Sequence, residues 1–182
     1  MAKPAKRKRA PRPARRSAGP KGRATVRPVP QGYHTVTPYL TVRGGVRAMD
    51  FYTRAFGARE LMRMEGPGGV LTHAELKIGD SIVMLSDEIP GMSSCKAPTS
   101  LGGTTVQLFL YVPDVDAAFK RAVDAGCKIL MELTDMFWGA RYGKLEDPLG
   151  NQWGLATHKE NLTPEEIGRR AQAAMAQMPG KK

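Results

Sequence analysis

The sequence predicts an α+β fold made of two βαβββ modules and a separate C-terminal helix. Two helical stretches, 46–56 and 115–125, each end at a glycine, Gly57 and Gly126, as a left-handed helix cap requires. Each stretch is preceded by one strand-like segment and followed by three more. Matching positions such as Leu40 and Leu110 lie 69 or 70 residues apart, a spacing that suits a duplicated module better than a solenoid repeat.

The elements follow from local patterns taken in chain order. The first helix carries Met49 and Phe56 at helical spacing, and the second opens with Asp114 as its N-cap. Alternation in the third and fourth strands directs one set of side chains toward the helices: Ala74, Leu76, Ile78, Val83 and Leu85. A third helix begins at Thr163 with Pro164 in its first turn and extends to about Met178.

Composition and charge divide the chain into a tail and a neutral domain. Residues 1–30 hold eleven Lys or Arg, six Pro and no acidic residue, whereas the remaining chain has 17 basic and 17 acidic residues. We expect residues 1–30 to be disordered and to attach weakly and nonspecifically to nucleic acid or anionic surfaces, or else to act only as a solubilising extension. The predicted domain covers 31–160, with modules at about 34–87 and 104–158, and 161–182 form a C-terminal helix and tail.

Several protein classes are excluded by the same composition. The chain has 182 residues, of which 41% are hydrophobic and only 2 are Cys, so a collagen, a coiled coil or a disulfide scaffold is excluded. No apolar run approaches the roughly 20 residues of a membrane helix, and the N-terminus lacks the apolar segment of a secretory signal. We therefore expect a cytoplasmic protein without membrane insertion.

Two motifs within this repeat are shared with a known family. The segment Phe51-Tyr-Thr-Arg-Ala-Phe-Gly-Ala58 and the turn Glu146-Asp-Pro-Leu-Gly-Asn151 resemble the vicinal oxygen chelate superfamily, which includes glyoxalase I, bleomycin-resistance proteins, fosfomycin-resistance enzymes and extradiol dioxygenases. The likeness covers about 34–160, and segments such as His73–Leu76 are similar to its PhnB-like branch. The resemblance implies a cupped mixed sheet that encloses a ligand cavity, and a homodimer.

The resemblance also implies where a metal would bind. Aligning the strand ends places Thr37, Met84, Gln107 and Gly154 at the superfamily's ligand positions, which usually hold His, Gln or Glu. This set offers one hydroxyl and one amide, too few donors for a divalent catalytic metal. We therefore expect no cofactor and no usual metal site. The glycine at 154 is expected to leave free volume for a ligand.

Strand alternation predicts which side chains line the cavity. His73 and Glu75 point to the same side of one strand and form either a catalytic acid/base pair, a relocated metal pair with Gln107, or a polar pair at the rim of the sheet. The expected ligand-binding residues combine aromatic surface with a few polar groups: Tyr39, Met84, Gln107, Phe109, Trp138, Arg141 and Tyr142. Trp138 would cover the cavity mouth with Arg141 nearby for an anionic group, or would instead fill a dimer interface.

Two hypotheses about function remain open from the sequence. The first is a binding protein of the bleomycin-resistance kind, a dimer that holds a small molecule in an aromatic cup without chemistry. The second is a lyase or isomerase of the same superfamily that uses His73 and Glu75, with or without a divalent metal, on a small oxygenated substrate.

Overall fold

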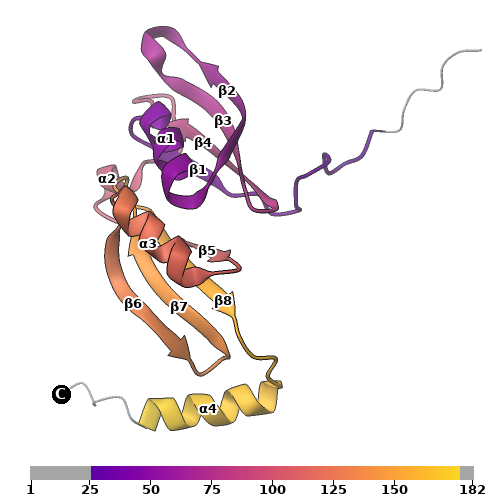
Figure 1. Cartoon of the computed structure of the whole chain (residues 1–182). Helices are drawn as coiled ribbons and strands as arrows, with labels where there is room; N and C mark the ends of the chain where they lie inside the picture. The colour runs from indigo at the N-terminus through magenta and orange to yellow at the C-terminus, as the bar shows by residue number, and fades with distance from the viewer. Residues whose placement is uncertain (1–25, 177–182) are drawn as a thin grey trace, which may run out of the picture.

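The computed structural model describes residues 26–176, and the predicted disordered tail therefore lies outside the described residues except for 26–30. Two four-stranded sheets form the molecule (Figure 1). Sheet A has the order β1-β4-β3-β2, and sheet B has the order β5-β8-β7-β6. In each sheet the first and last strands pair in parallel and the remaining pairs are antiparallel. The predicted α+β fold of two βαβββ modules is confirmed.

The first module contains β1 (Tyr39–Val42), α1 (Gly45–Phe56), β2 (Arg59–Glu65), a short 3-10 turn η1 (Pro67–Gly69), β3 (Leu71–Ile78) and β4 (Ser81–Asp87). After a connecting segment with the short helix α2 (Pro98–Leu101), the second module contains β5 (Gln107–Tyr111), α3 (Val115–Ala125), β6 (Lys128–Met136), β7 (Ala140–Glu146) and β8 (Gln152–His158). The predicted glycine caps are confirmed, since Gly57 and Gly126 have φ of 66° and 119°.

Each module caps its own helix from the end of its last strand. In the first module Asp87 accepts hydrogen bonds from the backbone amides of Gly44 and Gly45 at 2.8 and 2.7 Å, where α1 begins. In the second, Thr157 accepts from the amide of Val115 at 2.8 Å, where α3 begins. Asp87 and Thr157 lie 70 residues apart. The sequence repeat therefore extends to the residues that satisfy the free amides of each helix N-terminus.

Helices α1 and α3 lie in front of sheets A and B in Figure 1 and contact each other between the modules. The core forms where these helices meet their sheets, and Trp153 and Tyr52 are completely buried in it. The opposite face of each sheet is covered by no helix among the described residues. We call these two surfaces the open face of sheet A and the open face of sheet B.

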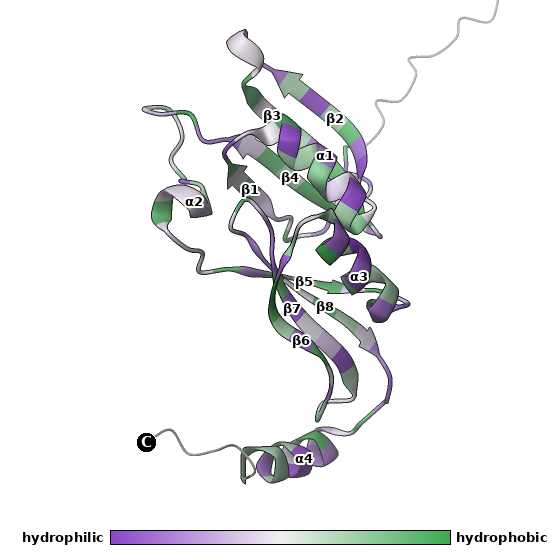
Figure 2. Ribbon diagram, turned by 60° about the vertical axis from the view of Figure 1, so that its left-hand side comes forward, coloured by the Kyte–Doolittle hydropathy of each residue, from purple (hydrophilic) through white to green (hydrophobic). Residues whose placement is uncertain are grey.

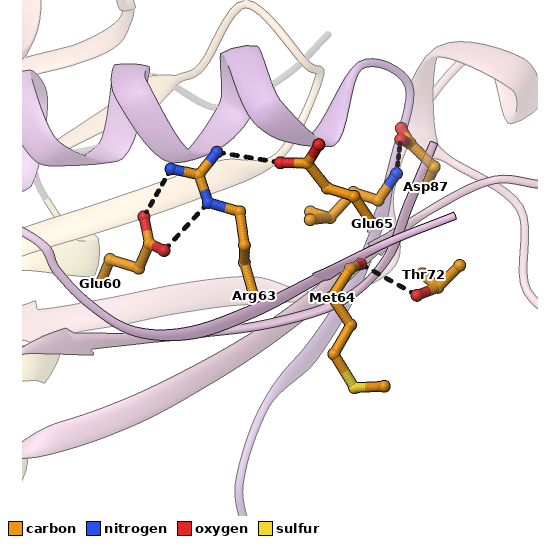
Figure 3. Close-up of polar contacts among 7 residues, drawn as sticks. Glu60, Arg63, Met64, Glu65, Thr72 and Asp87 are labelled. Carbon is orange, nitrogen blue, oxygen red and sulfur yellow. Dashed lines mark hydrogen bonds and ion pairs between the residues drawn. The ribbon is translucent and has the colours of Figure 1, made fainter. Parts of the chain in front are cut away.

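Strand β2 at the edge of sheet A shows the difference between its two faces. Figure 3 shows Arg63 extending to one side of the strand, where it contacts Glu60 at 2.9 Å and Glu65 at 3.2 Å, while Met64 points to the other side. On that open face Met62 and Met64 are 41% and 54% exposed. Charged side chains therefore lie on the helix side of β2, and exposed apolar side chains lie on its open face.

Helix α4 (Pro164–Ala176) follows β8 and has none of its described residues fully buried. Its predicted start is confirmed, and its predicted end near Met178 lies outside the described residues. Figure 2 shows α4 set apart from both modules, with hydrophilic and hydrophobic residues alternating along its ribbon. No helix among residues 26–176 is long and apolar enough to cross a membrane.

Candidate functional site

The open face of sheet A carries a row of side chains from neighbouring strands. Strand pairing places Tyr39 beside Met84, Met84 beside Glu75, and Glu75 beside Met62. The hydroxyl of Tyr39 lies 3.1 Å from Nδ1 of His73, whose Nε2 lies 3.3 Å from the Glu75 carboxylate. Since the carboxylate only accepts, these partners assign the imidazole proton to Nε2 and make Nδ1 the acceptor of the Tyr39 hydroxyl. The structure thus brings the predicted pair together on one face.

Residues 28–38 form an arm that lies across part of this open face. The hydroxyl of Tyr33 donates a hydrogen bond to Glu75, and Pro38 accepts one from the amide of Met84 at 2.9 Å. Ile82 faces the same side yet is only 6% exposed, because the arm covers it at Gly32. A cavity of about 480 Å³ remains between the arm and Met84.

Tyr33 was not among the residues predicted for the site, because the arm has no counterpart in the second module. The position 70 residues further along is Gly103, in the segment that connects the two modules. Strand alternation, which located the other residues of the face, gives no information on a segment outside the strands. The only signal in the sequence is that Tyr33 is a lone aromatic residue directly after the proline-rich tail.

The hydrogen bond from Tyr33 changes the acidity of both groups. It is the largest cause that lowers the pKa of Glu75 below its usual value, and the bond from His73 acts in the same direction. Burial opposes these effects in part. The same bond raises the pKa of Tyr33 above its usual value. Glu75 is therefore held as a carboxylate with two donors, which is the state required of a base or of a hydrogen-bond acceptor for a ligand.

We predict that Tyr33→Phe raises the pKa of Glu75, because the mutation removes its strongest donor. A depressed pKa means that Glu75 contributes its stability in full above the unfolded-state carboxyl pKa and loses it as pH falls through the lower folded-state value. The variant should therefore show a smaller loss of stability in that acidic range. NMR titration of the Glu75 carboxyl carbon measures the shift. As a control, Tyr39→Phe should change the Glu75 pKa little, since Tyr39 contacts His73 instead; equal pKa values in wild type and Tyr33→Phe would contradict the prediction.

The open face of sheet B carries a cluster of aromatic side chains. Phe109 from β5 and Tyr142 from β7 stack with ring centroids 5.4 Å apart and planes 4° apart, and Trp138 meets Tyr142 edge-on at 5.8 Å. Gln107 donates a hydrogen bond to the Tyr142 hydroxyl at 2.8 Å. Phe109 is 44% exposed and the neighbouring Tyr111 is 67% exposed. Four of the predicted ligand-binding residues thus form one cluster, which we call the aromatic cluster: Gln107, Phe109, Trp138 and Tyr142.

The expectation that Gly154 leaves free volume is wrong. A Cβ atom at this position would lie 2.2 Å from the Gln107 amide nitrogen, 2.8 Å from the Tyr142 ring and 3.1 Å from the Phe109 ring. The space beside Gly154 is therefore already filled by the aromatic cluster. The glycine lets Gln107, Phe109 and Tyr142 occupy this space, in which a Cβ atom would collide with all three.

The structure does not bring Arg141 to the aromatic cluster. Its guanidinium holds the Asp116 carboxylate through bonds of 2.8 to 3.1 Å near the start of α3, and lies 3.6 Å from Asp135. Because successive residues of a strand point to opposite faces, Arg141 and Tyr142 face opposite sides of sheet B. The prediction that Arg141 lies beside Trp138 over the cavity is therefore wrong, and Arg141 is better described as an ion-pair partner of α3.

The predicted ligand residues thus form two groups, one on each sheet. Tyr39 and Met84 lie with His73 and Glu75 on sheet A, and the aromatic cluster lies on sheet B. Within residues 26–176, no hydrogen bond or aromatic contact joins the two groups. A single enclosed cup therefore requires a further surface opposite each open face.

The four positions at which the resemblance places metal ligands do not fit a divalent metal. Thr37 donates its hydroxyl to the carbonyl of His34 at 3.1 Å, and the Gln107 amide is engaged with Tyr142. Met84 offers a thioether, and Gly154 offers no side-chain donor. Among the described residues no group of three or more His, Cys, Asp or Glu side chains is placed to hold a metal ion. These donors do not make the site that the superfamily uses for metal chemistry.

The fold defines the class of protein: it has two βαβββ modules, and each sheet has a helix on one face and an open face on the other. The chain matches the model of the Glyoxalase/Bleomycin resistance protein/Dioxygenase superfamily over residues 33–155. The protein therefore belongs to this superfamily, as the resemblance predicted. Members of the superfamily commonly dimerise and bind small molecules.

The chain is also similar to individual proteins and solved structures. An uncharacterised protein of Mycobacterium tuberculosis strain H37Rv is 46% identical over 143 residues, which cover 78% of this chain and 82% of that protein. The crystal structure of TioX from Micromonospora sp. ML1 has 34% identity and a TM-score of 0.56, covering 67% of this chain and 96% of TioX. A PhnB protein from Bacillus cereus, at 20% identity, shares the fold with a TM-score of 0.51, covering 68% and 99% of the two chains.

Proposed function

We propose that the protein binds a small molecule with a planar aromatic part on the open face of sheet B, without chemical conversion. The stacked pair Phe109 and Tyr142 supports this proposal most strongly. Phe109 leaves 44% of its surface in solvent, whereas its stacking partner Tyr142 is only 8% exposed, so a planar ligand would stack on the exposed part of Phe109 and extend the pair. Gln107 and the Tyr142 hydroxyl add the polar groups that orient a ligand.

We also propose that a second copy of the chain completes each site. The helices of both modules are used within the chain, so the open faces are the surfaces left for closing a cavity. A homodimer in which sheet A of one copy covers sheet B of the other would enclose the aromatic cluster and the His73–Glu75 pair together. The mass of the full chain in solution tests this homodimer, and a monomer at micromolar concentration would contradict it.

We further propose the division into a binding domain at 31–160, a basic tail and a C-terminal helix, and a cytoplasmic location.

The binding proposal is tested with an uncharged planar probe, 2-naphthamide, by titration calorimetry. We expect saturable binding to the wild-type chain, weakened about tenfold by Phe109→Ala or Tyr142→Ala, which corresponds to about 1.4 kcal/mol of lost stacking. Met175→Ala removes an exposed apolar side chain from α4, which is part of neither sheet, and should bind as the wild type does. Absence of saturable binding, or equal binding by all four proteins, would contradict the proposal.

The second candidate function is a lyase or isomerase reaction at His73 and Glu75. It is favoured by the hydrogen-bonded chain from Tyr39 through His73 to the Glu75 carboxylate, which is suited to exchanging a proton with a bound substrate. Metal analysis of full-length protein purified without chelator tests the metal-dependent form of this reaction. Near-stoichiometric metal in the wild type that is lost in His73→Ala would favour the enzyme; equally low metal in both would contradict the metal-dependent form.

A further inference from the structure

We propose that Lys144 supplies the positive charge of the ligand site on sheet B, and that the ligand is a planar aromatic anion such as an aromatic carboxylate. The inference rests on the proposed function and names its ligand class. It assigns to Lys144 the role that the sequence analysis expected of Arg141.

Strand β7 places Lys144 on the same face as Tyr142. The intervening Gly143 meets the Phe119 ring of α3, and Leu145 is completely buried in the core beneath that helix. Arg141 also points to this side, where it binds Asp116. Because side chains alternate along a strand, Tyr142 and Lys144 both project from the open face.

Strand pairing places Lys144 at the edge of the aromatic cluster. Lys144 lies beside Gly154 in β8, and Gly154 lies beside Phe109 in β5. On its other side Lys144 pairs with Met131 of β6, which packs against the cluster. Neighbouring strands are about 4.8 Å apart, so the Lys144 stem begins about 10 Å from the backbone of Phe109, within the reach of a lysine side chain and a two-ring ligand. Lys144 as a whole is half-buried, and a lysine in this setting covers apolar surface with its stem and presents its ammonium at the rim.

No acidic group of the described chain neutralises this ammonium. None of the ion pairs found among residues 26–176 includes Lys144. The nearest carboxylate on the same face of β7 is Glu146, which lies opposite Lys128. Glu75 is the residue of sheet A that matches Lys144 in the sequence repeat, and its carboxylate already accepts hydrogen bonds from Tyr33 and His73. The other cation on this strand, Arg141, is paired, so Lys144 is the charge left for a ligand next to exposed rings.

The experiment compares two probes that differ only in charge, 2-naphthoate and 2-naphthamide, by titration calorimetry on the full chain at physiological ionic strength. We expect wild type to bind the anion about fivefold more tightly, the effect of one partly exposed ion pair. Lys144→Met should bind both probes equally and with the wild-type affinity for the amide. Lys144→Arg should restore the preference. Lys128→Met removes a charge from the same sheet away from the cluster and should keep the preference, which controls for the general attraction of a basic chain.

The outcomes separate this inference from the proposed function. Equal binding of both probes to the wild type, or an unchanged preference in Lys144→Met, would overturn the role of Lys144 and leave the aromatic site standing. Failure of both probes to bind would overturn the aromatic site and the inference with it. A preference lost in Lys128→Met as well as in Lys144→Met would assign the effect to overall charge and refute a specific contact.

Discussion

Asp147→Ala should lower the free energy of unfolding by about 3–5 kcal/mol, the largest effect we expect from a polar substitution. The Asp147 carboxylate is only 3% exposed and accepts from the Tyr52 hydroxyl at 2.9 Å and the Trp153 indole nitrogen at 2.9 Å. It also accepts from the backbone amides of Leu149 and Asn151 at 2.9 Å. Alanine leaves these buried donors without a partner, and each buried unsatisfied group costs about 1–3 kcal/mol.

Urea denaturation at neutral pH measures this loss. Asp124→Ala is the matched control, because Asp124 is an exposed aspartate whose one ion pair among residues 26–176 is with Lys120 on α3, and it should change stability by less than about 0.5 kcal/mol. Since Tyr52 belongs to α1 and Asp147 follows β7, the network joins the two modules. A double-mutant cycle with Tyr52→Phe should therefore show coupling. A loss below about 1 kcal/mol in Asp147→Ala would contradict the central role of this carboxylate.

Gly143→Ala should cost about 1–3 kcal/mol, the usual effect of adding a methyl group to a filled core. A Cβ atom at Gly143 would lie 2.5 Å from the Phe119 ring and 3.1 Å from the Leu133 side chain. Phe119 is 5% exposed, so the ring has no free space to move into without displacing α3 from sheet B. Thermal and urea unfolding measure the loss.

Gly103→Ala provides the matched control for this prediction. Gly103 lies in the segment before β5, has no atom within 4 Å of an added Cβ, and does not need a left-handed backbone. The same chemical change there should be neutral or slightly stabilising, because alanine restricts the unfolded chain more than glycine does. Equal stability of the two variants would show that α3 does not depend on the close approach at Gly143.

The fold could be predicted because its signals are local and occur twice. Gly57 and Gly126 end the two helices in the same left-handed conformation, and each module buries a helix against one face of its own sheet. Alternation in β3 and β4 correctly separated the buried Ala74, Leu76 and Leu85 from the open-face pair His73 and Glu75. These patterns depend on the period of a strand or helix, which the sequence expresses directly.

The candidate site could be predicted only in part, because contacts between strands depend on pairing register. Strand alternation places Tyr142 on the open face of sheet B and Arg141 on the opposite face. The prediction instead grouped Arg141 with Trp138 and Tyr142, because Trp138 lies in the loop just before them. The space beside Gly154 is filled by side chains from the neighbouring strands β5 and β7. The sequence of β8 alone cannot predict which side chains those are. Tyr33 belongs to an arm that lies outside the repeat, so neither period nor duplication pointed to it.

The sequence by itself determined the two βαβββ modules, their helix caps, the superfamily and the faces of the strands, since each depends on residues close together in the chain. The tertiary structure alone decided which side chains meet. It paired Arg141 with Asp116, directed Tyr33 to Glu75, stacked Phe109 on Tyr142 above Gly154, and left Lys144 without an acidic partner among residues 26–176. The three side-chain pairs join residues 25 to 42 positions apart, and only strand register and helix packing bring such residues within hydrogen-bonding or stacking distance.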